Sequence, residues 1–175
     1  MSRFLYIIFF ILLFPVPSSL GAEKATPLEV VQKVVAAEKF LADNDPDKLQ
    51  HFNNADSEWS WGGTYVFVLD CSRITVSAHP VQPGLIGRDL SLLRDVKGKL
   101  FFVELCTASE KGGWVEYYWP KPGEKEASRK ISYMRQIPGT EFQVGAGLYE
   151  DVLDLEELVD FTNEYFSFHP DNQPK

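Results

Sequence analysis

Aromatic and cationic side chains alternate through one segment of the chain, and together they suit the binding of a small organic acid. Two runs, Trp114–Trp119 and Lys130–Ile137, read as β-strands, and side chains two apart in a strand lie on one face: Val115, Tyr117 and Trp119 in the first run, and Ile131, Tyr133 and Arg135 in the second. If the two runs pair symmetrically about the loop between them, Tyr117 and Trp119 share a face with Tyr133. Rings on that face would contact the alkyl part of the ligand, while an ammonium, a phenol and an imidazole would bind its carboxylate.

The candidate ligand-binding residues come from this hairpin, from its ends and from two neighbouring segments. Lys121 leaves one strand end and Lys130 enters the other, so either can supply a positive charge. The candidates are His79, Phe101, Tyr117, Trp119, Lys121, Lys130 and Tyr133.

Several candidates also have a purely structural interpretation. Tyr117 and Trp119 fit the core or rim of a sheet as well as a ligand site. Lys121 and Lys130 fit solvated loop charges, because a lysine stem can lie on apolar surface while its head stays in water. His79 precedes a proline, which explains an extended backbone, and its ring can satisfy a backbone group instead of a ligand. The residues alone leave these alternatives open.

Strand-like runs surround the candidates and predict an antiparallel sheet. Each run is rich in β-branched or aromatic residues and is bounded by turn-forming residues. The predicted strands are Thr64–Leu69, Ile74–Ala78, Trp114–Trp119, Lys130–Ile137 and Phe142–Tyr149. The segment Pro138–Thr140 predicts a tight turn between the last two strands, because Pro presets φ and Gly tolerates positive φ.

Helices are expected on both sides of this strand region in the sequence. Thr26–Glu29 matches a capping box with Pro at the first helical position, and apolar residues then recur at helical spacing to Leu41. Asp45 followed by Pro restarts the helix as a short second piece to about Phe52. Near the C-terminus an amphipathic helix is predicted over about residues 150–168, with acids in its first turn where the helix dipole favours them.

Several short motifs follow one another in a fixed order between about Val30 and Asp151. They are Tyr65-Val66-Phe67-Val68, His79-Pro80, Gly87-Arg88-Asp89-Leu90, Gly113-Trp114-Val115, Trp119-Pro120-Lys121-Pro122-Gly123, Ser132-Tyr133 and Pro138-Gly139-Thr140. Taken together, they resemble the single Cache domain, an extracytoplasmic sensor relative of PAS folds. The resemblance implies an α+β, PAS-like Cache fold, with a long N-terminal helix packed on an antiparallel sheet of about five strands and with a C-terminal helix. It also implies a small ligand such as acetate, propionate, lactate or pyruvate.

The N-terminus has the layout of a secretory signal. Arg3 precedes the apolar run Phe4–Phe14, and prolines and small residues follow up to Ala22. The run is shorter than the roughly 20 residues that a bilayer core demands, which favours a cleaved signal over a retained anchor. We therefore expect a signal peptide over residues 1–22 and a single Cache domain over residues 23–175, with its core at about 30–151. The mature protein is expected to be periplasmic or secreted, without stable membrane insertion.

Composition and motifs narrow the classes of function. A chain of 175 residues with 45% hydrophobic residues can bury one core of ordinary size. Its formal net charge of −8 disfavours nucleic acid as a partner. The sequence has no Cys-x-x-Cys, no Gly-x-Ser-x-Gly and no phosphate loop, and its three histidines lack metal-ligand spacing. We therefore predict no enzymatic activity, no metal site and no cofactor.

Cys71 and Cys106 are the only two cysteines of the sequence. Export of the protein would permit a disulfide between them. Cys71 lies in a predicted turn, and Cys106 lies in a helix predicted over Leu100–Ser109. This placement leaves both a bridge and two separate, half-buried thiols open.

Two hypotheses about function follow from these features. The leading one is an exported, sensor-type Cache protein that binds a short-chain carboxylate. It would pass occupancy to a separate partner, such as a membrane receptor or another periplasmic protein, because the sequence ends at Lys175, soon after the last predicted helix. The alternative is a periplasmic protein-interaction module without a small ligand, in which the acidic C-terminal helix makes the contact.

Overall fold

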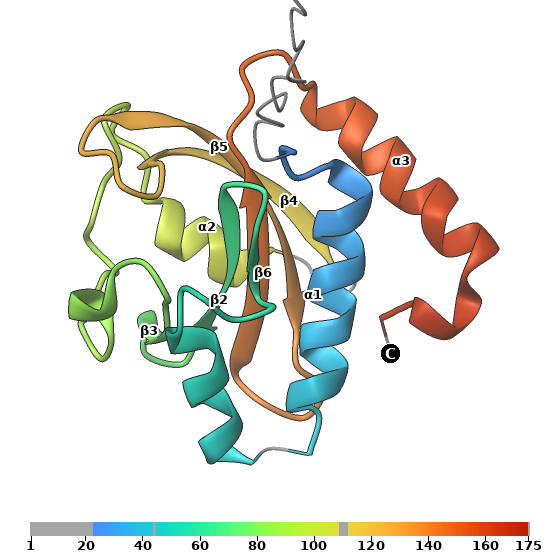
Figure 1. Ribbon diagram of the computed structural model, residues 1–175, viewed down its shortest axis with the longest axis horizontal. Helices are drawn as coiled ribbons and strands as arrows, with labels where there is room; N and C mark the ends of the chain where they lie inside the picture. Colours follow the sequence, from blue (N-terminus) through green and yellow to red (C-terminus); the bar gives the residue numbers. More distant parts are fainter. Residues whose placement is uncertain (1–22, 44, 109–111, 175) are drawn as a thin grey trace, which may run out of the picture.

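The computed structural model describes residues 23–43, 45–108 and 112–174, which form an antiparallel sheet with helices on both faces (Figure 1). The strand order is β1-β2-β6-β5-β4, and β3 pairs with the same edge of β2 as β1. The strands are β1 (Ser60–Trp61), β2 (Thr64–Asp70), β3 (Thr75–Ala78), β4 (Gly113–Pro120), β5 (Ala127–Gln136) and β6 (Phe142–Leu148). The predicted α+β fold is therefore confirmed, and β1 is an addition to the predicted strands.

The helices form two layers. In Figure 1, α1 (Pro27–Leu41) and α3 (Leu155–Phe168) lie side by side on one face of the sheet, and α2 (Phe101–Thr107) covers the other. The predicted capping box is present, because Thr26 Oγ1 accepts from the Glu29 amide and the Glu29 carboxylate accepts from the Thr26 amide. Three short 3-10 helices complete the elements: η1 (Pro46–Asn53), η2 (Pro83–Leu85) and η3 (Pro170–Asn172).

The C-terminal helix begins later than the predicted residue 150. Asp154 caps α3 by accepting from the amides of Glu156 and Glu157, at 2.7 and 3.3 Å. Val152, which the amphipathic pattern included, is 87% exposed and lies before the helix. The helix therefore starts at the first residue after an effective N-cap and not where the apolar pattern begins.

Each face of the sheet carries its own buried cluster. The cluster under α1 and α3 includes Val34, Val66, Ile131, Tyr133, Val144 and Phe166. The cluster under α2 is rich in rings and includes Tyr65, Phe67, Phe101, Val115, Tyr117 and Met134. All seven residues of β2 are buried, so the centre of the sheet is covered on both faces. Alternate residues of each strand therefore belong to different cores.

The predicted pairing of the β4–β5 hairpin was wrong in register. Tyr117 pairs with Lys130, and Tyr133 pairs with Trp114. Because a shift by one residue moves every side chain to the other face, Tyr133 lies under the helices, whereas Lys130 lies on the same face as Tyr117. The loop comprises residues 121–126, and β5 begins at Ala127, earlier than predicted.

A buried ion pair joins three elements on the helix-covered face. Arg135 Nε of β5 lies 2.6 Å from Glu38 Oε2 of α1, and both side chains are buried. Arg135 Nη1 also donates to the main-chain oxygen of Asn172 at 2.7 Å, which binds the segment after α3 to the sheet. Removal of either charged partner would take away the opposite charge that faces the other in this buried site, which is costly.

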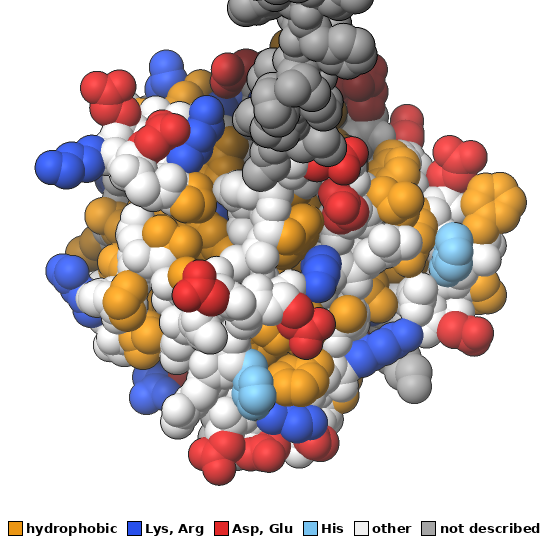
Figure 2. All heavy atoms as spheres, viewed as in Figure 1, with side chains coloured by type: hydrophobic (Ala, Val, Ile, Leu, Met, Phe, Trp, Pro, Cys, Tyr) orange, Lys and Arg blue, Asp and Glu red, His pale blue; other side chains and the backbone are white. Residues whose placement is uncertain are grey.

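Acidic and basic side chains are interspersed on the face seen in Figure 2. Within the ranges that the structure describes, no helix is long and apolar enough to cross a bilayer. The predicted signal peptide, residues 1–22, lies outside the described residues.

Candidate functional site

A cavity lies between α2 and the sheet face that α2 covers. Its lining comes from β2, β4, β5, α2 and the end of β3: Tyr65, Phe67, His79, Phe101, Phe102, Leu105, Tyr117, Trp119 and Lys130. Eight of these nine residues are buried, and Trp119 is partly exposed. Trp119 therefore forms the accessible edge of the cavity.

Five of the seven predicted site residues line this cavity, namely His79, Phe101, Tyr117, Trp119 and Lys130. Lys121 instead lines a separate cavity that also contacts Lys24 and Glu150. Tyr133 lies on the opposite face of the sheet, where its ring packs 5.2 Å from that of Trp114. The register of the hairpin explains why Tyr133 is not with the other five.

Lys130 places its ammonium among aromatic rings. Its side chain is 1% exposed, and Nζ lies 4.1 Å from the ring centroid of Tyr65, 5.0 Å from that of Tyr149 and 5.3 Å from that of Phe67. Within the described part of the chain, no carboxylate forms an ion pair with this ammonium. Burial disfavours the charged form and lowers the pKa of Lys130 to about 7.

His79 is held as a neutral ring beside this lysine. Its Nδ1 accepts from the amides of Val81 and Gln82 at 3.3 and 3.0 Å, so the neutral imidazole carries its proton on Nε2. Burial, and then the charge of Lys130, lower the pKa of His79 to about 3. The His79 ring thus satisfies backbone amides, which is one of the two alternatives for this residue, and its Nε2–H remains a hydrogen-bond donor near neutral pH.

Phenol groups complete the polar atoms near the cavity. Tyr117 Oη lies 2.9 Å from Ser132 Oγ, and Tyr149 Oη donates to the carbonyl of Pro120 at 2.9 Å. Burial raises the pKa of Tyr65 to about 12 and also raises the pKa values of Tyr117 and Tyr149. These hydroxyls are therefore protonated throughout the physiological range.

Two glycines of β6 leave space for the side chains of β5. A Cβ atom at Gly147 would lie 3.0 Å from Cε of Lys130 and would overlap Oγ of Ser132. A Cβ atom at Gly145 would overlap Sδ of Met134. The lysine stem therefore lies against a strand that has no side chain at this point.

The cavity is narrow as the side chains stand. It has room for about one water molecule. A short organic acid would therefore need a lining side chain to move. Trp119 is the candidate for this movement because it alone among the lining residues is partly exposed.

The elements that cover the cavity are fixed to the sheet. Cys71 and Cys106 are joined by a disulfide, with their Cα atoms 5.3 Å apart, which links α2 to the β2–β3 turn. Of the two alternatives that the sequence left open, the bridge is thus the one present. The Asp95 carboxylate accepts from the amides of Lys97, Lys99 and Tyr118, which ties the segment before α2 to the edge of β4.

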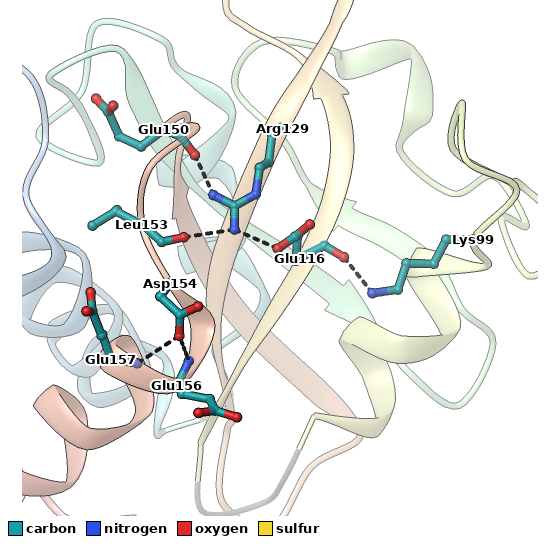
Figure 3. Close-up of polar contacts among 8 residues, drawn as sticks. All are labelled: Lys99, Glu116, Arg129, Glu150, Leu153, Asp154, Glu156 and Glu157. Atoms are coloured by element: carbon teal, nitrogen blue, oxygen red, sulfur yellow. Dashed lines mark hydrogen bonds and ion pairs between the residues drawn. The ribbon is translucent and has the colours of Figure 1, made fainter.

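On the other face of β5, Arg129 binds the segment that precedes α3 to the sheet (Figure 3). Its Nη1 donates to the carbonyl of Glu150 at 2.7 Å, and its Nη2 donates to the carbonyl of Leu153 at 2.9 Å. Nη2 also pairs with the Glu116 carboxylate at 2.6 Å. The carbonyl of Glu116 in turn accepts from Lys99, so this network reaches the segment that covers the cavity.

Four lining residues were missed by the sequence interpretation: Tyr65, Phe67, Phe102 and Leu105. Tyr65 and Phe67 lie two apart in β2, but every residue of this strand is buried, so apolar alternation does not mark the cavity face. Phe102 and Leu105 fall within the helix predicted over Leu100–Ser109 but are not among the predicted ligand contacts. The available signal was the alternation of rings in β2, which places Tyr65 and Phe67 on one face.

A protein-family model described as Single Cache domain 2 matches residues 32–158. The methyl-accepting chemotaxis protein McpP of Pseudomonas putida is 36% identical over 80 residues, which are 45% of this chain and 15% of that protein. The sensor histidine kinase MctS of Rhizobium johnstonii is 32% identical over 88 residues, or 50% of this chain and 19% of that protein. The matched regions thus cover only a small part of both relatives.

Solved structures of sensor domains have the same fold. A periplasmic sensor domain of a chemotaxis protein superposes with a TM-score of 0.56 at 30% identity, covering 69% of this chain and 88% of that one. A methyl-accepting chemotaxis protein from Vibrio parahaemolyticus gives 0.57 at 26% identity, covering 70% and 85%. A Cache chemosensory domain, described in terms of carboxylic acid recognition, gives 0.52 at 29% identity, covering 71% and 84%.

Proposed function

The chain belongs to the single Cache domain family, and we propose that it binds a short-chain carboxylate in the cavity around Lys130. The observation that carries this proposal is the buried ammonium, which has aromatic rings around it and no carboxylate partner among the described residues. A buried charge is costly unless it is paired. A ligand carboxylate would supply the partner, and charge-assisted hydrogen bonds are the strong ones.

The rest of the lining suits the same class of ligand. The rings of Phe101, Tyr117 and Trp119 offer apolar surface for an alkyl group of a few carbons. His79 Nε2–H is available to donate to a second carboxylate oxygen. The similar Cache domain described in terms of carboxylic acid recognition supports this chemical class. Acetate, propionate, lactate and pyruvate are the candidates.

We further propose that the domain works in the periplasm and that its occupancy is read by a partner protein. The matched relatives, a chemotaxis receptor and a sensor kinase, support a role in signalling. Lys121 and Tyr133 are not part of the proposed site, because neither lines the cavity that contains Lys130.

Calorimetric titration with a panel of short acids tests the proposal. Trp119→Ala should weaken binding about tenfold or more, because it removes the apolar edge of the cavity. Lys130→Met should weaken it by at least as much, since a hydrogen bond to a charged group contributes about 1.5–3 kcal/mol. Tyr133→Phe serves as the matched control, because this residue lies on the other face, and its affinity should equal that of the parent.

Two outcomes would contradict the proposal. One is a folded parent protein that binds none of the acids, which would favour the interaction-module hypothesis. The other is binding that Lys130→Met and Trp119→Ala leave unchanged, which would place the ligand elsewhere. Circular dichroism of each variant separates loss of binding from loss of fold.

A further inference from the structure

We propose that Lys130 forms a reversible imine with the carbonyl carbon of a short 2-oxo acid, so that the cavity distinguishes such acids from those without a carbonyl group. This inference rests on the proposed function, because it concerns the same cavity. It adds a covalent step to the recognition of one subclass of ligand.

The position of the amine carries the inference. A lysine reacts with a carbonyl group only as the neutral amine, and an apolar site without counter-ions favours that form. Lys130 Nζ lies among the rings of Tyr65, Phe67 and Tyr149, and no carboxylate of the described residues pairs with it. A lysine on the protein surface has neither property.

The cavity also limits where the amine can lie. The Lys130 stem runs against Gly147, where a Cβ atom would lie only 3.0 Å from Lys130 Cε. Tyr117, the pairing partner of Lys130 on β4, stacks on Phe101 of α2 with 4.7 Å between ring centroids. The amine is therefore enclosed between the sheet and α2, on the face where the proposed ligand would bind.

The reaction is balanced without an added oxidant or reductant. The amine nitrogen forms a bond to the carbonyl carbon, and a proton passes from nitrogen to the former carbonyl oxygen. The carbon–oxygen bond then breaks, that oxygen leaves as one water molecule, and a carbon–nitrogen double bond remains. The second proton of that water comes from solvent, and His79 Nε2–H lies in the same cavity as a hydrogen-bond donor to the departing oxygen. A protonated imine keeps a positive charge next to the ligand carboxylate.

Reductive trapping tests the inference on the full chain. The protein is incubated with pyruvate and sodium cyanoborohydride, which reduces a protonated imine to a stable secondary amine. The expected result is one adduct, heavier than the protein by the mass of pyruvic acid less one oxygen atom. Peptide mapping should place this adduct on Lys130 and not on the other lysines. Lactate, which has no carbonyl group, should compete with the trapping and give no adduct.

Variants provide the matched comparison. Lys130→Arg retains a cation but cannot form an imine, and Lys130→Met retains the length of the side chain, so both should lose the adduct. If either variant fails to fold, the mapping of the parent adduct still decides the question.

Calorimetry of pyruvate and lactate separates the two proposals. Binding of both acids without any trapped adduct would overturn the imine and leave the proposed function intact. An adduct spread evenly over surface lysines would overturn it as well. Absence of both binding and adduct would overturn the imine together with the proposed function.

Discussion

Ligand affinity should fall as the pH rises through neutrality, because Lys130 loses its proton in that range. Burial lowers the pKa of this ammonium to about 7. A carboxylate binds the charged form, so the apparent dissociation constant is the intrinsic one divided by the protonated fraction. That fraction is about 0.9 at pH 6 and about 0.1 at pH 8, which corresponds to a roughly tenfold weaker affinity at the higher pH.

Other groups around the cavity do not titrate in this interval. The pKa of His79 is lowered to about 3 by burial and by Lys130, so the imidazole is neutral throughout. Burial raises the pKa of Tyr65 to about 12 and raises those of Tyr117 and Tyr149 as well, so the phenols keep their protons. A short carboxylic acid is ionised well below pH 6. The change in affinity is therefore assigned to one group.

The assay is isothermal titration with acetate or propionate at several pH values between about 6 and 8, in buffers of different ionisation enthalpy. Binding should take up protons above pH 7, since the bound carboxylate restores the charged form of Lys130. Lys130→Arg keeps its charge over the whole interval and should show a flat profile. Constant affinity in the parent, or an equal slope in this variant, would refute the reasoning.

Further predictions concern stability and packing. Reduction of the Cys71–Cys106 bridge should lower the unfolding free energy by about 2–5 kcal/mol in denaturant titrations; equal midpoints with and without reductant would count against it. Gly147→Ala should weaken acid binding about tenfold, because the new Cβ would overlap Ser132 Oγ and the Ile131 carbonyl oxygen and press on the Lys130 stem, so β5 must shift; Gly84→Ala, which has open space around it, should not weaken binding. Lys130→Met should raise the melting temperature at pH 7, by roughly 2–4 °C per kcal/mol gained. The folded pKa of Lys130 lies below its unfolded value, so the parent gains stability from about pH 7 to about pH 10, and the advantage of Met should shrink over that interval; an advantage independent of pH would contradict this.

The elements of the fold could be predicted because their signals are local. The capping box at Thr26 and the turn around Gly139 each depend on a few adjacent residues, and both are present. The β1–β2 hairpin was also readable, since Gly62 and Gly63 form a two-residue turn with positive φ between Trp61 and Thr64. That signal was overlooked, and β1 was missed with it.

Which residues line the site could not be predicted fully, because this depends on tertiary packing and not on short sequence signals. The register of the β4–β5 pairing depends on the length of the loop over residues 121–126. A register shift by one residue would move Tyr133 to the other face of the sheet. Burial of Lys130 runs against the usual exposure of lysine, so no propensity predicts it. The bridge between Cys71 and Cys106 depends on how α2 packs against the sheet, which only the folded chain determines.

Arg129 and Lys130 are adjacent in β5 but point to opposite faces of the sheet. One peptide unit, about 3.8 Å between Cα atoms, therefore separates the ammonium in the cavity from the guanidinium that binds the carbonyls of Glu150 and Leu153. A ligand that draws Lys130 away from its rings would pull on the same backbone that anchors the start of α3. The two sides of the sheet are thus linked through one peptide unit and not through a chain of packed side chains. A change in amide exchange at the first turn of α3 on adding acid would report this linkage.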